Sequence, residues 1–232
     1  MATVYRLSTV GGKASPRFKA YIELGAQRVL VSGYNPMATT AVLATIEGLL
    51  AVEAEPVAEA LANRTVASLG TAADRAMHLC VKTPGMWTDR VASEVEHRMV
   101  RGPVDEIVLW TGEPVDLTSL QTAVVAQSTR LAWSDRRGHP VTVADFVARE
   151  GLAEAMAGVP GRRVAAVADL LAVVADETSP GVATALLYGD DTARALGWSP
   201  LGIAAMDGYA HATALANEAL QWSTADKVLE RM

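Results

Sequence analysis

The chain has 232 residues and a formal net charge of −6, and half of its residues are hydrophobic although only 5% are aromatic. This composition is typical of a folded globular protein and excludes global disorder, while the single Cys80 excludes both an internal disulfide and a structural zinc site. The longest apolar stretch, residues 38–54, contains Glu47 and Glu53, and the N-terminus lacks a signal-peptide pattern. We therefore predict a cytoplasmic protein without a membrane span.

The chain opens with three short segments that are rich in β-forming residues and are separated by Gly- and Pro-containing turns. Their predicted strands are 3–10, 17–24 and 28–32. Such short connections predict an antiparallel meander. The period of the apolar pattern then changes from two residues, as in a strand, to 3.6 residues, as in a helix. This change predicts helices at about 41–54, 56–81 and 89–100.

The middle of the chain alternates between strand and helix patterns. The two predicted strands are 105–110 (DEIVLW) and 129–133 (TRLAW), and a helix from residue 116 or 118 to about 127 separates them. A capping box of Thr142 and Asp145 predicts the start of a helix that continues to about residue 157. The segment 158–163 (GVPGRR) is the predicted domain boundary.

Beyond this boundary the patterns are mainly helical. We predict helices at 164–175 and at about 200–222, an apolar run of undecided type at 182–188, and a short last helix after residue 223. The helix at 200–222 is apolar over a broad surface. It must either pack back on its own domain or bind a second copy or another protein.

The order of these elements and several local sequences resemble the ribonuclease H-like superfamily. The matching segments are LSTVGG at 7–12, AVLATIEGL at 41–49, IVLWTG at 107–112, LAW at 131–133, GH at 138–139 and ADFVA at 144–148. A second alignment would use 56–69 as the fourth strand and 212–220 as the last helix, but residues 57–69 have helical rather than strand periodicity.

The resemblance implies an α/β fold with a mixed sheet, in which the three-strand antiparallel meander is joined by two further strands. On this view residues 1–157 form the ribonuclease H-like domain, with a helical insertion at about 55–101, and residues 158–232 form a helical C-terminal extension. The fold alone is weak evidence for activity.

The positions that carry the family's catalytic carboxylates differ in this chain. Val10, Ala41 and Gly112 stand where acids are expected, whereas Asp145 and the proton-carrying His139 are present. Nuclease chemistry in the family needs several carboxylates around two Mg²⁺ ions. The resemblance therefore implies a non-catalytic protein that acts by binding or scaffolding, without a metal or cofactor.

An alternative is a divergent Mg²⁺-dependent nuclease. It would use Asp145 together with nearby acids, for which the candidates are Glu47, Glu113 and Asp116. A third hypothesis is a structural or assembly protein that binds another protein, or a second copy of itself, through its C-terminal helices.

Basic residues suggest where a nucleic acid would bind. Residues 1–37 contain five cations and one acid, giving +4 and leaving −10 for the rest, so we predict contacts through Lys13, Arg17 and Lys19. A second cluster, Arg130, Trp133, Arg136 and Arg137, could grip phosphates and stack on a base. The other interpretation of this cluster buries Trp133 in the core and leaves the arginines in water.

Overall fold

The structure is a computed structural model that describes the backbone of residues 3–5, 8–9, 19–24, 27–32, 54–71, 76–81, 95–100, 106–111 and 117–231. Side chains are described for residues 57–71 and 118–231, apart from 59 and 119. The chain divides into two compact units, residues 1–64 with 72–124, and residues 65–71 with 125–232. The predicted boundary at 158–163 falls inside the second unit.

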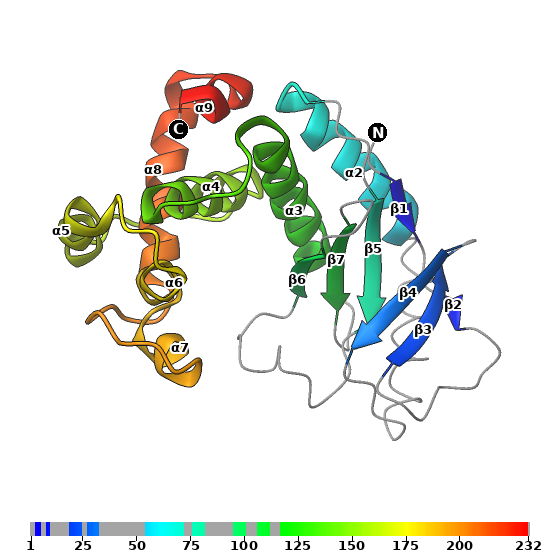
Figure 1. The fold of residues 1–232 in the computed structure, drawn as a ribbon. Helices are drawn as coiled ribbons and strands as arrows, with labels where there is room; N and C mark the ends of the chain where they lie inside the picture. Colours follow the sequence, from blue (N-terminus) through cyan, green and yellow to red (C-terminus); the bar gives the residue numbers. More distant parts are fainter. Residues whose placement is uncertain are drawn as a thin grey trace. The chain divides into compact units, whose positions relative to one another are not determined.

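The first unit contains all the described strands, arranged in two separate sheets (Figure 1). One sheet has the order β1-β5-β7-β6, in which β1, β5 and β7 are parallel and β6 is antiparallel to β7. The other has the order β2-β3-β4 and is antiparallel throughout. The strands are β1 Thr3–Tyr5, β2 Ser8–Thr9, β3 Lys19–Leu24, β4 Gln27–Ser32, β5 Ala76–Val81, β6 Val95–Val100 and β7 Glu106–Thr111.

This arrangement corrects the predicted ribonuclease H-like α/β fold, which is wrong. The meander and the strand at 105–110 do not share one mixed sheet, and the predicted strand 129–133 lies inside helix α3 (Leu117–Arg137). The part of the chain described with its side chains is helical and contains no strand. The predicted helical insertion at about 55–101 is not helical throughout, because α2 (Ala54–Ser68) is followed by strands β5 and β6.

The physical reason for the error at 129–133 is burial. Every residue from Ala126 to Trp133 is buried, including the four polar residues 127–130, so the apolar residues of this segment do not mark one buried face with helical spacing. A short run of this kind cannot be distinguished from a buried strand by its pattern. Context from the rest of α3 overrides local β-propensity.

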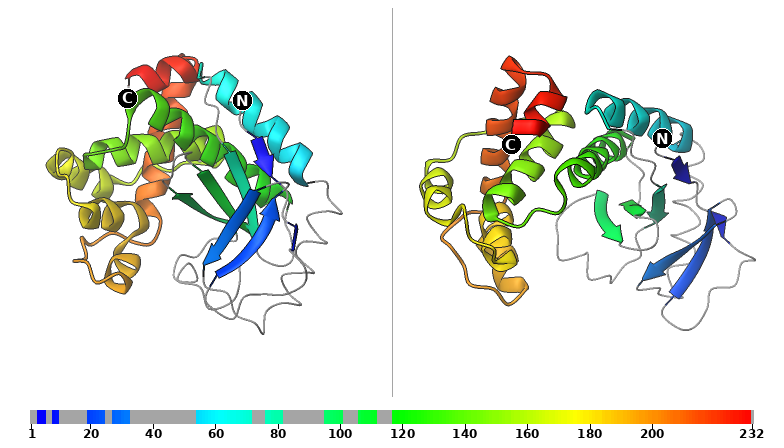
Figure 2. Two further views of the ribbon diagram at one scale, coloured as in Figure 1. Left: turned by 45° about the vertical axis from the view of Figure 1, so that its right-hand side comes forward. Right: turned by 45° about the horizontal axis from the view of Figure 1, so that its top comes forward.

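The second unit is a bundle of helices (Figure 2). It begins with the last turn of α2 and the later part of α3. The helices that follow are α4 Val143–Met156, α5 Ala165–Val174, α6 Pro180–Tyr188, α7 Asp190–Ala195, α8 Asp207–Trp222 and α9 Ala225–Arg231. The predicted helices at 143–157 and 164–175 are confirmed, and the undecided run at 182–188 is helical.

Helices α4 and α8 form the most extensive packing in the second unit. They approach so closely that a Cβ atom on Gly151 would overlap the backbone carbonyl of Ala212. A Cβ on Gly208 would likewise overlap the carbonyl of Leu186 in α6. The predicted helix at 200–222 therefore packs back on its own unit, although it begins only at Asp207, after Met206 in a left-handed conformation (φ 60°).

Two apolar clusters hold these helices together. The first is centred on α4, α6 and α8 and is completed by one face of α5; its buried members include Val147, Leu186 and Ala212. The second joins α3, α4 and α9 around Trp133, Leu152 and Leu229. Burial of these side chains is the main contribution to stability in such a bundle.

The segment 158–163 is held along α8. The Arg162 N–H donates to the Ala210 carbonyl at 2.8 Å, and its guanidinium pairs with Asp207 at 2.6 Å. Arg163 forms a bidentate pair with Glu218, eleven residues further along the same helix. The last two residues of this segment are thus attached to α8 at Asp207 and at Glu218.

Candidate functional site

The predicted catalytic residues do not form a described site. Val10, Ala41 and Gly112, like Glu47, Glu113 and Asp116, lie outside the described residues. His139 is exposed in the link between α3 and α4. The role of these residues stays a prediction.

Asp145 has a local structural role. Its carboxylate accepts hydrogen bonds from the backbone N–H groups of Thr142 (3.0 Å) and Val141 (3.1 Å), and the Thr142 hydroxyl accepts from the Asp145 N–H. These backbone hydrogen bonds, that of Thr142 first, lower the pKa of Asp145. The predicted capping box is therefore confirmed.

The predicted basic residues of the N-terminal part are described only in part. Lys13 and Arg17 lie outside the described residues, and Lys19 is the first residue of β3, opposite Ser32 of β4. Binding of a nucleic acid by these three residues remains a prediction.

The second predicted cluster is engaged within the fold. Trp133 is buried in the core, and the Arg137 guanidinium lies 5.2 Å from its ring centre. Arg137 also donates to the carbonyls of Leu229 and Glu230, and Arg136 donates to the carbonyl of Leu69. A hollow lined by these arginines, Leu229 and Glu230 is open to solvent, but the Arg137 donor is directed at carbonyls near the end of α9, and Arg136 is shared between Leu69 and the Glu230 carboxylate. Cations stabilise the C-terminal end of a helix in this way.

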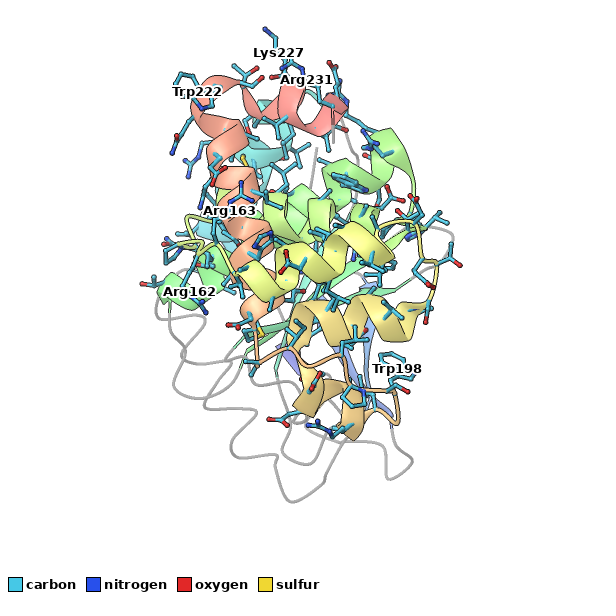
Figure 3. All side chains as sticks on the ribbon, turned by 90° about the vertical axis from the view of Figure 1, so that its left-hand side faces the viewer. Arg162, Arg163, Trp198, Trp222, Lys227 and Arg231 are labelled. Carbon is cyan, nitrogen blue, oxygen red and sulfur yellow. The ribbon has the colours of Figure 1, made fainter. Side chains whose placement is uncertain are left out.

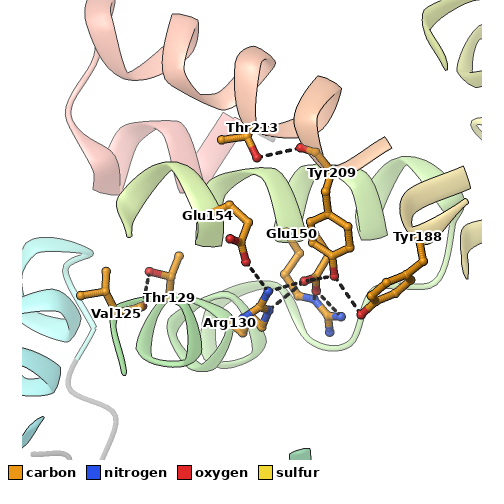
Figure 4. Close-up of polar contacts among 9 residues, drawn as sticks. Val125, Thr129, Arg130, Glu150, Glu154, Tyr188, Tyr209 and Thr213 are labelled. Atoms are coloured by element: carbon orange, nitrogen blue, oxygen red, sulfur yellow. Dashed lines mark hydrogen bonds and ion pairs between the residues drawn. The ribbon is translucent and has the colours of Figure 1, made fainter. Parts of the chain in front are cut away.

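Arg130, the remaining member, belongs to a buried polar cluster that joins four helices (Figure 4). Its guanidinium contacts Glu150 at 2.6 Å and Glu154 at 2.9 Å, both on α4. Glu150 also accepts from the Tyr209 hydroxyl of α8 at 2.9 Å, and Tyr209 lies 2.9 Å from the Tyr188 hydroxyl of α6. The interpretation that left this arginine in water is therefore wrong.

The electrostatics of this cluster favour a charged Arg130 beside a charged Glu150. Burial is the largest single influence and opposes the guanidinium charge, but the interactions with Glu150, Tyr209 and Glu154 together outweigh it and raise the pKa of Arg130. Burial, and then the negative charge of Glu150, raise the pKa values of Tyr188 and Tyr209, so both phenols stay protonated. Arg130, Glu150 and Tyr209 are each at most 6% exposed. A substrate cannot reach them, so we interpret the cluster as a structural link.

A different feature of the second unit faces solvent, on helix α5. Nine of its ten residues (AAVADLLAVV) are apolar, yet Val167 is its only buried residue. Leu170, Leu171 and Val174 complete the face that packs on the core. The opposite face is exposed and carries Ala165, Ala166, Asp169, Ala172 and Val173.

The exposed face of α5 differs from that of an ordinary surface helix, which carries mainly charged and polar residues. Val173, in the last turn of α5, is 81% exposed. One acid, Asp169, lies a turn before Val173, and two more, Asp176 and Glu177, follow the helix end. We call Ala165, Ala166, Ala172, Val173 and these three acids the α5 surface.

The three acids of the α5 surface form no ion pair with any residue that the structure describes. Two of them follow the C-terminus of α5, where the helix dipole favours a cation, and the last turn contains no basic residue. The signal in the sequence for this surface is the absence of a polar face in residues 165–174.

Comparison with known proteins gives no relative: no protein family, curated protein or solved structure matches the chain. Within the described part of the chain, no three His, Cys, Asp or Glu side chains are grouped so that they could hold a metal ion. None of the helices described is both long enough and apolar enough to cross a membrane.

Proposed function

We propose that the chain is a non-catalytic binding protein whose helical second unit associates with another protein through the α5 surface. The observation that carries this proposal is that α5 is apolar in nine of ten positions but buries only Val167. A helix that is apolar on all sides is normally covered on all sides. The exposed half of α5 is therefore the part of this unit that a protein partner would cover.

The charge of the second unit supports a protein rather than a nucleic acid as its partner. Residues 65–71 and 125–232 contain nine basic and thirteen acidic residues, a net charge of −4. Six of the nine cations form ion pairs within the unit: Arg130, Arg136, Arg149, Arg162, Arg163 and Arg194. A polyanion would meet net repulsion there. The cytoplasmic location predicted from the sequence is part of this proposal.

Site-specific photocrosslinking tests the proposal. A benzophenone amino acid would replace Val173 in the full chain, and a matched protein would carry it at Asp191, another exposed helical position whose side chain is 91% exposed. We expect irradiation of producing cells to yield a discrete protein adduct from position 173 and none from position 191. Equal yields from both positions, or no adduct at 173, would refute the proposed function.

A further inference from the structure

A second unusual surface lies at the C-terminal end of the same unit (Figure 3). Trp222, the last residue of α8, is 88% exposed. Lys227 and Arg231 are both exposed and stand four residues apart on α9, so they share one side of that helix. We call Trp222, Lys227 and Arg231 the C-terminal surface.

The cations of the C-terminal surface differ from the other basic residues of the unit. Arg137 donates to backbone carbonyls and six further arginines pair with carboxylates. Lys227 and Arg231, in contrast, form no ion pair with a described residue. They are the cations of this unit that remain available to an acidic partner surface.

The two surfaces are complementary in chemistry. On the α5 surface an exposed apolar residue, Val173, is flanked by three unpaired acids, and on the C-terminal surface an exposed Trp222 is accompanied by two unpaired cations. Tryptophan and arginine are enriched among residues that dominate the binding energy of protein interfaces. A cation placed beside Asp176 and Glu177 would also offset their unfavourable position at the C-terminus of α5.

The two surfaces lie apart within the unit in every view, so one copy cannot join its own pair (Figures 1 and 2). We infer that the α5 surface of one copy of this chain binds the C-terminal surface of a second copy, with Trp222 against Val173 and with Lys227 and Arg231 facing Asp169, Asp176 and Glu177. This inference rests on the proposed function and names its partner. Because the two surfaces differ, the contact is head to tail and closes into a ring or extends into a chain.

The test uses two charge-reversed forms of the full chain. One carries Lys227→Glu and Arg231→Glu, and the other carries Asp169→Lys and Asp176→Lys; all four positions are exposed, so folding is preserved. Sedimentation at concentrations up to about 1 mM, where a weak contact is still populated, measures the molar mass. Circular dichroism and thermal unfolding confirm that each variant is folded.

We expect the mass of the native chain to rise above 24.4 kDa with concentration, and the rise to weaken with salt. Each variant alone should stay monomeric at least tenfold beyond the concentration at which the native chain associates, and an equimolar mixture of the two should associate again. Trp222→Ala should weaken association of the native chain by a similar factor. A monomeric native chain, association that neither charge reversal changes, or a mixture that fails to associate would overturn the inference.

The photocrosslinking experiment separates this inference from the proposed function. An adduct at position 173 with the mass of two chains, attached within residues 222–231, supports both. An adduct with a different protein overturns the self-association and leaves the proposed function standing. The absence of any adduct refutes both.

Discussion

The α4–α8 pair and helix α5 belong to the same unit, but they use apolar residues in opposite ways. Between α4 and α8, glycine allows the backbones to approach, and the polar groups enclosed beside them are joined in the Arg130–Glu150–Tyr209 cluster. Helix α5 has fewer polar residues than either, yet half of its surface faces solvent. Apolar composition alone therefore does not determine which face of a helix the fold covers, and the uncovered face is available for association.

The largest expected effect on stability is at the buried Arg130–Glu150–Tyr209 cluster beside the α4–α8 pair. Glu150→Gln removes the more deeply buried of the two carboxylates that pair with Arg130, and breaking a buried ion pair costs about 3–5 kcal/mol. Urea unfolding measures this loss in the free energy of unfolding. Glu218→Gln is the matched control, because it breaks an exposed pair with Arg163 and should change stability little. Equal effects of the two substitutions would show that the cluster is not a structural link.

A smaller effect is expected where the two backbones meet. Gly151→Ala adds a single methyl group that would overlap the Ala212 carbonyl, so the helices must separate, at a cost of about 1–3 kcal/mol. Ala172→Leu, which adds more atoms on the α5 surface, should change the unfolding free energy by only about 0.5 kcal/mol. If Ala172→Leu lowered the unfolding free energy more than Gly151→Ala, the exposed face of α5 would be packed rather than open to solvent.

His211, on α8, is hydrogen-bonded to the residue that precedes α5. Its Nδ1 accepts a hydrogen bond from the Val164 N–H at 3.0 Å, and burial, then the charge of Arg163, lower its pKa. The folded chain therefore binds fewer protons than the unfolded chain, so stability should fall as the pH falls below about 6.5, the ordinary histidine value. We expect the urea midpoint to drop between pH 7.5 and 5.5, as the usual His range implies, and His211→Gln to remove this dependence. If the urea midpoint of His211→Gln fell by the same amount over this pH range, titratable groups other than His211 would be responsible for the pH dependence.

The smallest expected effect on stability is at Val173 of the α5 surface. Val173→Asp should leave the free energy of unfolding within about 0.5 kcal/mol of the native value, because the side chain is already in water. The same substitution should abolish association, since it places a fourth acid and no apolar group at the contact. A strong destabilisation without a change in molar mass would mean that Val173 belongs to the core.

The sequence predicted some local features of the fold because they depend on neighbouring residues. The capping box of Thr142 and Asp145 correctly marks the start of α4, and the helices at 143–157 and 164–175 follow from apolar spacing. Residues 95–100, predicted as helix, instead pair with β7 as strand β6. Strand pairing depends on residues distant in sequence, which a local pattern does not contain.

The candidate sites were harder to predict for a related reason. The residue types at Arg130, Trp133, Arg136 and Arg137 suit phosphate binding, but the partners of the arginines, at Leu69 and on α4 and α9, are distant in the sequence. The type of a side chain does not reveal whether a carboxylate or a carbonyl of the same chain already occupies its donors. The α5 surface was visible only as a missing polar face, which becomes informative once the packing side of the helix is known.

The attachment of residues 158–163 along α8 has a consequence for proteolysis. The Arg162 and Arg163 side chains are at least half exposed and form a dibasic sequence that trypsin favours. A protease must pull several residues into an extended conformation, and here this requires detaching Gly161 from Ala214 and breaking the ion pairs on both sides. Within the second unit, digestion should therefore begin at Lys227 or Arg231, and the dibasic sequence should stay intact until the helices themselves come apart.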